Sequence, residues 1–255
     1  MRMLKLIAAL LLLDSILVSA CTTKPPARMD AYVGPTTQQE QAMAAESLKA
    51  LPGPLEVGVL VINDTSAQGS APALSDKGRE FLTDQVRQRI EEKLPLRLVK
   101  VLPATDLASR QDPQLLARLA QEQGVGYLLL AIFSGAESEI PLFLPLDGAP
   151  EQGGARPRVS GFEAINYALA ELALLDAKTG QVLIRADGRA WSKLNRLYVP
   201  VQSNSYPVIH RSLRIAPIYP KEENAKDMLR GIAGDEALEQ AVFHLEMEWP
   251  KQNAS

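Results

Sequence analysis

Three short apolar runs separated by two amphipathic stretches dominate residues 55–133 of the chain. The runs at 55–62, 96–101 and 127–133 are rich in leucine, valine and isoleucine, and they have the length of buried strands. The resulting order is strand, helix, strand, helix, strand, which favours a layer of helices packed on a sheet. The sequence therefore predicts an α/β fold built on a mixed sheet.

The two intervening stretches carry the start and stop signals of helices. Ser75 can cap the first helix, and Pro95 stops it. Asp112-Pro113 can start the second helix, because aspartate accepts free backbone N–H groups and proline loses no bond in the first turn. Gly124 ends that helix in the usual C-terminal position. The apolar stripes are Leu82, Val86, Ile90 and Leu94 in the first helix, and Leu115, Leu116, Leu119 and Ala120 in the second.

A long β-hairpin is predicted in the second half of the chain. Residues 162–175 and 181–191 form two extended segments, and Asp176 and Gly180 supply the turn chemistry between them. We expect this pair of strands at or near an edge of the sheet. The backbone at such an edge could pair with another chain, or the stretch after Tyr198 could cover it.

The segment 137–161 breaks the regular pattern with prolines and glycines. Because proline cannot donate to a strand ladder, we expect no continuous pairing here, and either a long loop or a protruding hairpin. Its apolar part is a candidate contact site for a partner, and the alternative is a disordered excursion. The candidate contact residues are Ile140, Leu142, Phe143 and Leu144.

The residues before the first strand are expected to connect an anchor to the folded domain. Residues 22–35 hold few large apolar groups, which indicates a solvated tether. Good helix formers follow, with Thr36 or Thr37 as the N-cap of a short helix. Residues 21–54 are therefore expected to contain a lipidated N-terminus, the tether and this helix.

A single α/β domain is expected over residues 55–249, with a polar tail at 250–255. Its C-terminal helix is expected to begin at Asp235 as the N-cap. The side of this helix that faces the core would hold Leu238, Ala241, Val242, Leu245 and Trp249.

The N-terminus has the form of a secretion signal. Basic residues precede an apolar run that ends at Val18 and is too short for a bilayer span, which needs about 20 apolar residues. The sequence Val-Ser-Ala before Cys21 resembles the bacterial lipobox, in which the signal is cleaved and the cysteine is acylated. Residues 1–20 are then a signal peptide. The alternative is an ordinary signal followed by a free thiol.

The lipobox resemblance implies fatty acyl chains on Cys21, which hold a protein to a membrane surface without spanning it. Thr22 stands where an aspartate would favour retention in the inner membrane, so the resemblance implies a bacterial outer-membrane anchor with the domain facing the periplasm. Cys21 is the only cysteine, so the domain must hold together through its core and not through an intrachain disulfide. The net charge of -3, with acids and bases interspersed, gives no indication of nucleic-acid binding.

No motif for catalysis or for cofactor binding stands out. Asp64-Thr65-Ser66 follows an apolar strand as in aspartic proteases, but the other aspartates lack the matching residues, so Asp64 is expected to end the strand through hydrogen bonds. His244 and Glu248 are spaced to share a helix face, whereas zinc needs three or four ligands. The sequence has neither a P-loop nor a dinucleotide-binding loop. We expect no metal, no cofactor and no enzyme activity.

Aromatic residues in or beside proline-rich segments are further candidates for a protein interface, because such rings often anchor protein contacts. They are Trp191, Tyr198, Tyr206 and Tyr219. The alternative for each residue is local packing of a long loop onto its own domain.

The element order and the hairpin sequence LLDAKTGQVL at 174–183 resemble an α/β periplasmic domain found in several lipoprotein families. These are the curli-secretion lipoproteins, the lipoprotein activators of peptidoglycan synthases and the rhombotarget-type lipoproteins, and the likeness covers roughly residues 55–192. Such domains act by binding, so the resemblance implies a non-enzymatic, membrane-anchored lipoprotein that binds a protein partner in an envelope, secretion or assembly complex. The alternative is an anchored hydrolase acting on peptide or cell wall, with Asp64 as its acid.

Overall fold

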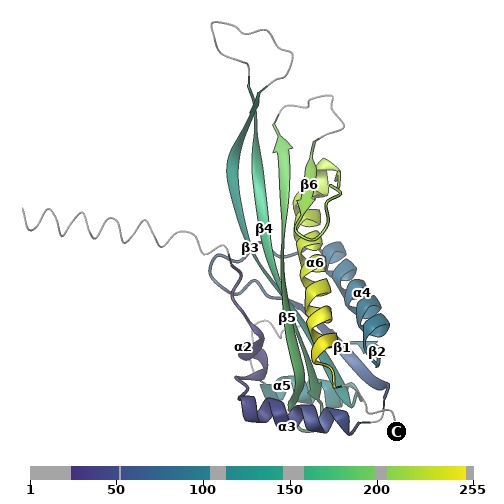
Figure 1. Cartoon of the computed structure of the whole chain (residues 1–255). Helices are drawn as coiled ribbons and strands as arrows, with labels where there is room; N and C mark the ends of the chain where they lie inside the picture. Colours follow the sequence, from purple (N-terminus) through teal and green to yellow (C-terminus); the bar gives the residue numbers. More distant parts are fainter. Residues whose placement is uncertain (1–23, 52, 104–112, 146–157, 199–205, 251–255) are drawn as a thin grey trace, which may run out of the picture.

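A computed structural model describes residues 24–51, 53–103, 113–145, 158–198 and 206–250. Six strands form one sheet in the order β2-β1-β3-β4-β5-β6 (Figure 1). The strands are β1 Leu55–Asn63, β2 Leu96–Val101, β3 Tyr127–Pro145, β4 Arg158–Asp176, β5 Val182–Leu197 and β6 Val208–Arg211. The α-helices are α2 Met29–Val33, α3 Gln38–Lys49, α4 Asp76–Lys93, α5 Pro113–Glu122 and α6 Ala225–Glu248.

The sheet is mixed, as the sequence predicts. β1 runs parallel to both β2 and β3, since α4 and α5 provide the crossovers, whereas β3, β4, β5 and β6 pair antiparallel. The α/β prediction, with its order of strand, helix, strand, helix, strand, hairpin and C-terminal helix, is confirmed. The hairpin turn lies at Asp176–Gly180, where the Asp176 carboxylate accepts hydrogen bonds from the N–H groups of Lys178 and Thr179.

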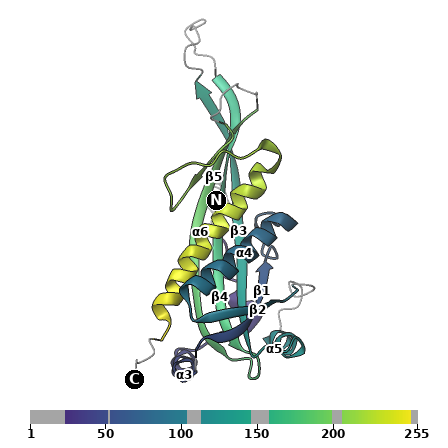
Figure 2. The same cartoon turned by 90° about the vertical axis from the view of Figure 1, so that its right-hand side faces the viewer.

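Helices cover the two faces of the sheet unequally (Figure 2). Alternate residues of β3 enter two cores: Leu129, Ala131 and Phe133 pack with the core beneath α4 and α6. Leu128, Leu130 and Ile132 pack with the core beneath α2 and α5. The helix α6 runs along much of β4 and β5, whereas α2 and α5 reach only the part of the opposite face near β1 (Figure 1).

The predicted start of the last helix at Asp235 is wrong, because α6 begins ten residues earlier, at Ala225. Asp235 lies inside the helix, where its carboxylate pairs with Arg89 of α4 at 2.7 Å. Gly234 allows α4 and α6 to approach closely, since a methyl group there would lie 3.1 Å from the side chain of Leu82. Gly234 therefore serves the packing of α6 against α4, whereas a methyl group at Gly231 would make only ordinary contact with Phe81.

Strand pairing continues through much of the proline-rich insert, so the expectation of no continuous pairing is wrong. Residues 127–145 of β3 pair without a break with residues 176–158 of β4, and Pro141 lies opposite Phe162. The carbonyl groups of Phe133 and Gly135 point away from β4, toward Asp64 and Ala71. Pro141 has the same parity, so its missing N–H lies on the open side of β3 and costs no bond to β4. The protruding hairpin is thus confirmed, and its residues 146–157 lie outside the described part.

The N-terminal stretch expected to be a solvated tether packs on the domain in its later half. Met29 and Tyr32 of α2 are buried, and α3 follows with Thr37 as its N-cap in a capping box with Glu40. The signal peptide, Cys21, Asp112 and the tail after Pro250 lie outside the described residues. No helix within the described residues is long and apolar enough to cross a membrane.

The closest approach between α6 and the sheet predicts one sharply destabilising change. A methyl group at Gly188 of β5 would overlap the carbonyl oxygen of Ala237 and the amide nitrogen of Ala241. Because α6 would have to move, we expect Gly188→Ala to lower the free energy of unfolding by about 1–3 kcal/mol, measured by urea denaturation. Gly126→Ala, a control site with no atom within 4 Å of the added methyl group, should change it by less than about 0.5 kcal/mol. Equal effects of the two changes would contradict this packing.

Candidate functional site

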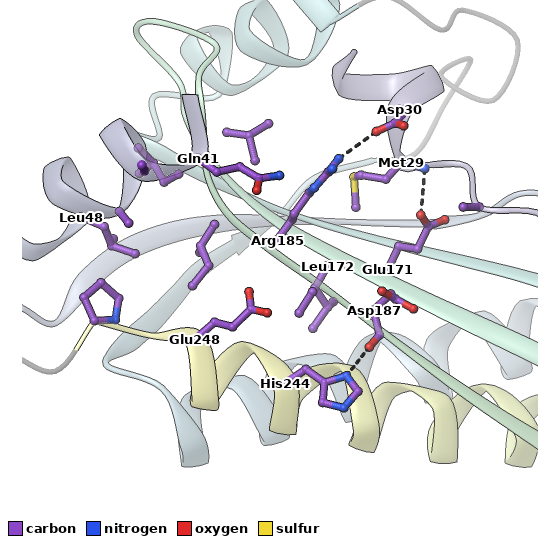
Figure 3. A pocket seen from close by; sticks show the side chains of 18 residues that line it. Met29, Asp30, Gln41, Leu48, Glu171, Leu172, Arg185, Asp187, His244 and Glu248 are labelled. Atoms are coloured by element: carbon purple, nitrogen blue, oxygen red, sulfur yellow. Dashed lines mark hydrogen bonds and ion pairs between the residues drawn. The ribbon is translucent and has the colours of Figure 1, made fainter. Parts of the chain in front are cut away.

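A groove of about 650 Å³ lies at the free edge of β5 (Figure 3). Its walls come from α2 and α3 on one side and from the C-terminal turns of α6 on the other, with β4 and β5 as its floor. This volume lies within the range of about 300–1,000 Å³ typical of ligand pockets. The groove is therefore large enough to hold a ligand.

The strand β5 positions two charged side chains in this groove. Arg185 and Asp187 alternate with Ile184 and Ala186, which are half-buried and pack against the core beneath α4 and α6, so both charged side chains project from the opposite face of the sheet, which α2 partly covers. Arg185 forms an ion pair with Asp30 of α2 at 2.8 Å. On the α6 side, Nδ1 of His244 lies 2.6 Å from the backbone carbonyl oxygen of Asp187 (Figure 3). Side chains of α2 and α6 thus contact β5 on the two sides of the groove.

Carboxylates outnumber cations among the groove residues. Asp30, Glu171, Asp187 and Glu248 line it together with Arg185 and His244. Arg185 is already paired with Asp30, and Asp187 is paired loosely with Arg189 at 3.7 Å. The remaining carboxylates, above all that of Glu248, make the groove electronegative. Such a groove attracts cationic groups.

Glu171 fastens the N-terminal segment to the sheet. Its carboxylate accepts hydrogen bonds from the backbone N–H groups of Arg28 at 2.6 Å and Met29 at 3.1 Å. Burial raises the pKa of Glu171 above its usual range, and the nearby negative charges of Asp187 and Asp30 add to this, while the two N–H groups oppose it. This buried acid therefore both seats α2 and lies beside the other carboxylates of the groove.

Asp64 forms a second, separate fastening at the end of β1. Its carboxylate accepts hydrogen bonds from Nε of Arg28 at 2.8 Å, from the Tyr32 hydroxyl at 3.0 Å, and from the N–H and hydroxyl of Ser66. Burial alone would raise the pKa of Asp64, but these bonds outweigh it and hold the pKa below its usual range. Burial and the neighbouring Asp64 raise the pKa of Tyr32. The bond from the Ser66 N–H confirms that Asp64 ends the strand through side-chain to backbone bonding.

The predicted contact residues fall into two places. Ile140 and Phe143, exposed by 53% and 60%, lie on the projecting part of β3, where Leu142 and Leu144 are half-buried. Tyr198 is 65% exposed and its ring packs against Phe162 of β4, with ring centroids 6.0 Å apart, near the base of that projection.

The remaining aromatic candidates lie farther along the sheet. Trp191 on β5 lies opposite Tyr167 of β4, away from the hairpin tip, and is 39% exposed. Tyr206 is half-buried just before β6, and Tyr219 is exposed. Further exposed apolar residues that the sequence analysis did not single out include Ile215 after β6, and Phe243 and Met247 one turn apart on α6.

The two residues considered as a metal pair lie together in the groove. His244 and Glu248 share one side of α6, and His244 bonds to the backbone of β5. Among the described residues, no group of three or more histidine, cysteine, aspartate or glutamate side chains is placed to hold a metal ion.

Comparisons with known proteins find distant similarities of structure. No protein-family model and no curated protein sequence matches this chain. PelC of Paraburkholderia phytofirmans, in a dodecamer, is similar at 11% identity and a TM-score of 0.27, over 73% of this chain and 94% of its own. A candidate lipoprotein of Caulobacter crescentus is similar at 12% identity and a TM-score of 0.32, over 80% of this chain and 93% of its own.

A third similar structure is a candidate neuraminyllactose-binding hemagglutinin homologue of Helicobacter pylori. It has 13% identity and a TM-score of 0.37, over 78% of this chain and 88% of its own. Similarities of this size show no function for this chain.

The hydrogen bonds of Glu171 predict that α2 becomes more mobile when this side chain is removed. Glu171→Ala removes both acceptors of the Arg28 and Met29 N–H groups, whereas Glu171→Gln keeps one carbonyl acceptor at the same place. We expect faster amide hydrogen exchange at Arg28, Met29 and the α2 amides in Glu171→Ala, with smaller changes in Glu171→Gln. Unchanged exchange in Glu171→Ala would show that α2 is held by other contacts.

The lowered pKa of Asp64 predicts a pH dependence of stability. The ionised carboxylate stabilises the fold above its unfolded pKa of about 3.9, and this contribution is lost as the pH falls through the lower folded pKa. We expect Asp64→Asn to cost on the order of 3 kcal/mol at pH 7, because the buried ion pair with Arg28 is broken. In urea denaturation, this difference from the native protein should shrink below about pH 4. The exposed Asp84→Asn is the control, and a difference independent of pH would contradict the assignment.

Proposed function

We propose that this chain is a lipid-anchored protein of the bacterial envelope that binds a protein partner through its projecting β3–β4 hairpin and catalyses no reaction. The observation that carries the proposal is the exposure of two apolar side chains, Ile140 and Phe143, on the part of β3 that continues past the end of β1 (Figure 1). They project from opposite faces of this strand, whose other side has no neighbouring strand there among the described residues. Exposed apolar groups of this kind often mark protein interaction sites.

Ion pairs brace the base of the hairpin against α6. Glu137 of β3 bonds to Arg230 at 2.7 and 3.2 Å, and Glu139 bonds to Lys226 at 2.6 Å. The ammonium group of Lys226 also lies over the ring of Phe162, 5.0 Å from its centroid. A braced surface loses less conformational freedom when it binds than a mobile loop would, which supports binding as the role of the hairpin.

The proposed anchor would hold the domain close to the membrane. The carbonyl oxygen of Pro26 accepts a hydrogen bond from the Ser134 hydroxyl at 3.3 Å, so the chain meets the sheet at Pro26. Four residues lie between Cys21 and Pro26, so the five residue steps from one to the other span at most about 18 Å when fully extended. Acylation of Cys21 would therefore place β3 near the membrane surface. The proposed location is the periplasmic side of the outer membrane, for which Thr22 after the cysteine is the support.

The geometry disfavours the alternative of a hydrolase with Asp64 as its acid. The carboxylate of Asp64 is fully buried, paired with Arg28, and has a pKa below its usual range. A general acid needs a raised pKa and contact with the substrate. These contacts support a structural role for Asp64, which holds α2 against the end of β1.

The binding proposal predicts that polar substitutions on the hairpin remove partner capture. We expect the double variant Ile140→Ser and Phe143→Ser to lose a crosslinked envelope partner, because two apolar anchors at about 2 kcal/mol each reduce affinity by much more than tenfold. The measurement is quantitative crosslinking and purification from cells with equal amounts of membrane-bound protein. Folding is checked by thermal unfolding.

A matched control lies at the opposite edge of the sheet. Val99 and Val101 of β2 are exposed by 47% and 50%, and changing both to serine removes a similar apolar surface. This control should retain the partner. Equal recovery of the partner by the hairpin variant, or no reproducible partner with the native protein, would contradict the proposal.

A further inference from the structure

The free edge of β5 is covered over only part of its length. β6 pairs with residues 192–195 of β5, and the N–H and carbonyl of Trp191 exchange hydrogen bonds with Ser212. Residues 182–190 extend beyond β6 on this side. One half of the edge is thus covered by the stretch after Tyr198, as one of the two expectations from the sequence had it, and the other half has no neighbouring strand among the described residues.

The backbone groups along the uncovered half can be assigned from their periodicity. The N–H of Arg189 bonds to the Gln240 side chain at 3.4 Å, and the carbonyl of Asp187 lies 2.6 Å from Nδ1 of His244. Together with Trp191, these bonds show that odd-numbered residues direct their backbone groups away from β4. Arg185 has the same parity. In the part of the chain that the structure describes, the N–H and carbonyl of Arg185 and the N–H of Asp187 have no hydrogen-bond partner.

These free backbone groups open into the groove between α3 and α6. Figure 3 shows Gln41 on α3, Arg185 on β5 and Glu248 on α6 around one space. An added strand would lie along the lower half of β5, in line with β6. One of its residues could exchange both backbone hydrogen bonds with Arg185.

The side chains of the groove select the chemistry of such a strand. Asp187 and Glu248 are exposed carboxylates. Asp187 lies 3.7 Å from Nε of Arg189, whereas no hydrogen bond or ion pair of Glu248 to another described residue is found. Apolar surface is contributed by Met29, Leu48, Leu172, Leu183 and Ile184. Side chains of an added strand alternate between its two sides, so basic residues could meet the carboxylates.

We propose that this groove binds an extended peptide segment with basic side chains, which pairs with the free edge of β5 as an added strand. Backbone pairing of this kind is a common mode of peptide recognition, in which main-chain bonds give affinity and side-chain contacts give selectivity. The site is separate from the β3–β4 hairpin, so the inference goes beyond the proposed function.

Peptide binding to the full-length protein in detergent tests the proposal. The probe is a short, fluorescein-labelled peptide in which lysine and threonine alternate, and fluorescence anisotropy at low salt measures its dissociation constant. We expect saturable binding, at least about tenfold weaker binding when glutamate replaces lysine, and a similar loss when the peptide backbone is N-methylated on its pairing side. No saturable binding, or equal binding of the three peptides, would overturn the proposal.

Charge-changing variants on α6 provide a matched pair. Glu248→Lys changes a groove carboxylate, and we expect it to weaken peptide binding about threefold to tenfold. Glu246→Lys makes the same change of net charge on the same helix but outside the groove, and it should leave binding unchanged. Equal weakening by the two variants would show that only the overall charge of the protein attracts the peptide, which would overturn the site.

Variants at Asp187 distinguish the contribution of its backbone N–H to peptide binding from that of its carboxylate. Asp187→Asn removes the charge and keeps the N–H, whereas Asp187→Pro also removes this outward N–H without removing a bond to β4. We expect Asp187→Pro to bind the peptide more weakly than Asp187→Asn, with both folded by circular dichroism. Equal affinity of the two variants would exclude edge pairing.

Two further outcomes would overturn the proposal by showing that something other than a basic peptide strand occupies the groove. Displacement of the peptide by spermidine, with unchanged binding of the N-methylated peptide, would indicate a cation site without strand addition. Self-association that Glu248→Lys abolishes would indicate a second copy of this chain in the groove. The hairpin variant Ile140→Ser with Phe143→Ser should bind the peptide normally, so failure of the two proposals can be distinguished.

Discussion

The structure depends on the unbroken antiparallel pairing of β3 with β4. Each of these strands has 19 residues, whereas β1 has 9. Pairing with β1 ends at Phe133, and after an isolated bridge between Ser70 and Ala136 β3 has no neighbouring strand on that side among the described residues. The helices α2 and α5 cover only the part of the sheet that includes β1, and the β3–β4 hairpin projects beyond them (Figure 2). The unequal lengths of the strands therefore create the exposed surfaces.

Close packing of α6 holds this long sheet together. Gly188 allows the backbone of β5 to meet the backbone of α6, and Gly234 gives room on α6 for the side chain of Leu82 from α4. Ser192 donates a hydrogen bond to the carbonyl of Leu229 at 2.6 Å. The same helix reaches both proposed binding surfaces. Arg230 and Lys226, near its start, brace the hairpin, whereas His244 and Glu248, near its end, line the groove. A rigid helix that touches both surfaces fixes their relative positions.

Local signals in the sequence correctly predicted many elements, and they failed where distant contacts decide the structure. Ser75 caps α4 and Thr37 caps α3, since these caps depend on residues three positions away. Aspartate is a common N-cap residue, but Asp235 lies inside α6 and pairs with Arg89, which is far away in the sequence. Pro141 suggests a break in pairing. The break does not occur because the position of its missing N–H faces the side of β3 that has no neighbouring strand among the described residues, which only the tertiary structure shows. The groove was not predicted, because its residues come from five separate parts of the chain.

The sequence by itself determined the order of the elements, the hairpin turn at Asp176–Gly180 and the apolar residues of the hairpin, because these depend on local composition and periodicity. It also marked Cys21 as the candidate anchor. The tertiary structure alone decided that Arg28 and Tyr32 bind Asp64, that Glu171 seats α2, and that the lower half of β5 stays open. These features depend on which side chains and backbone groups remain without partners after packing, and no local pattern in the sequence records that.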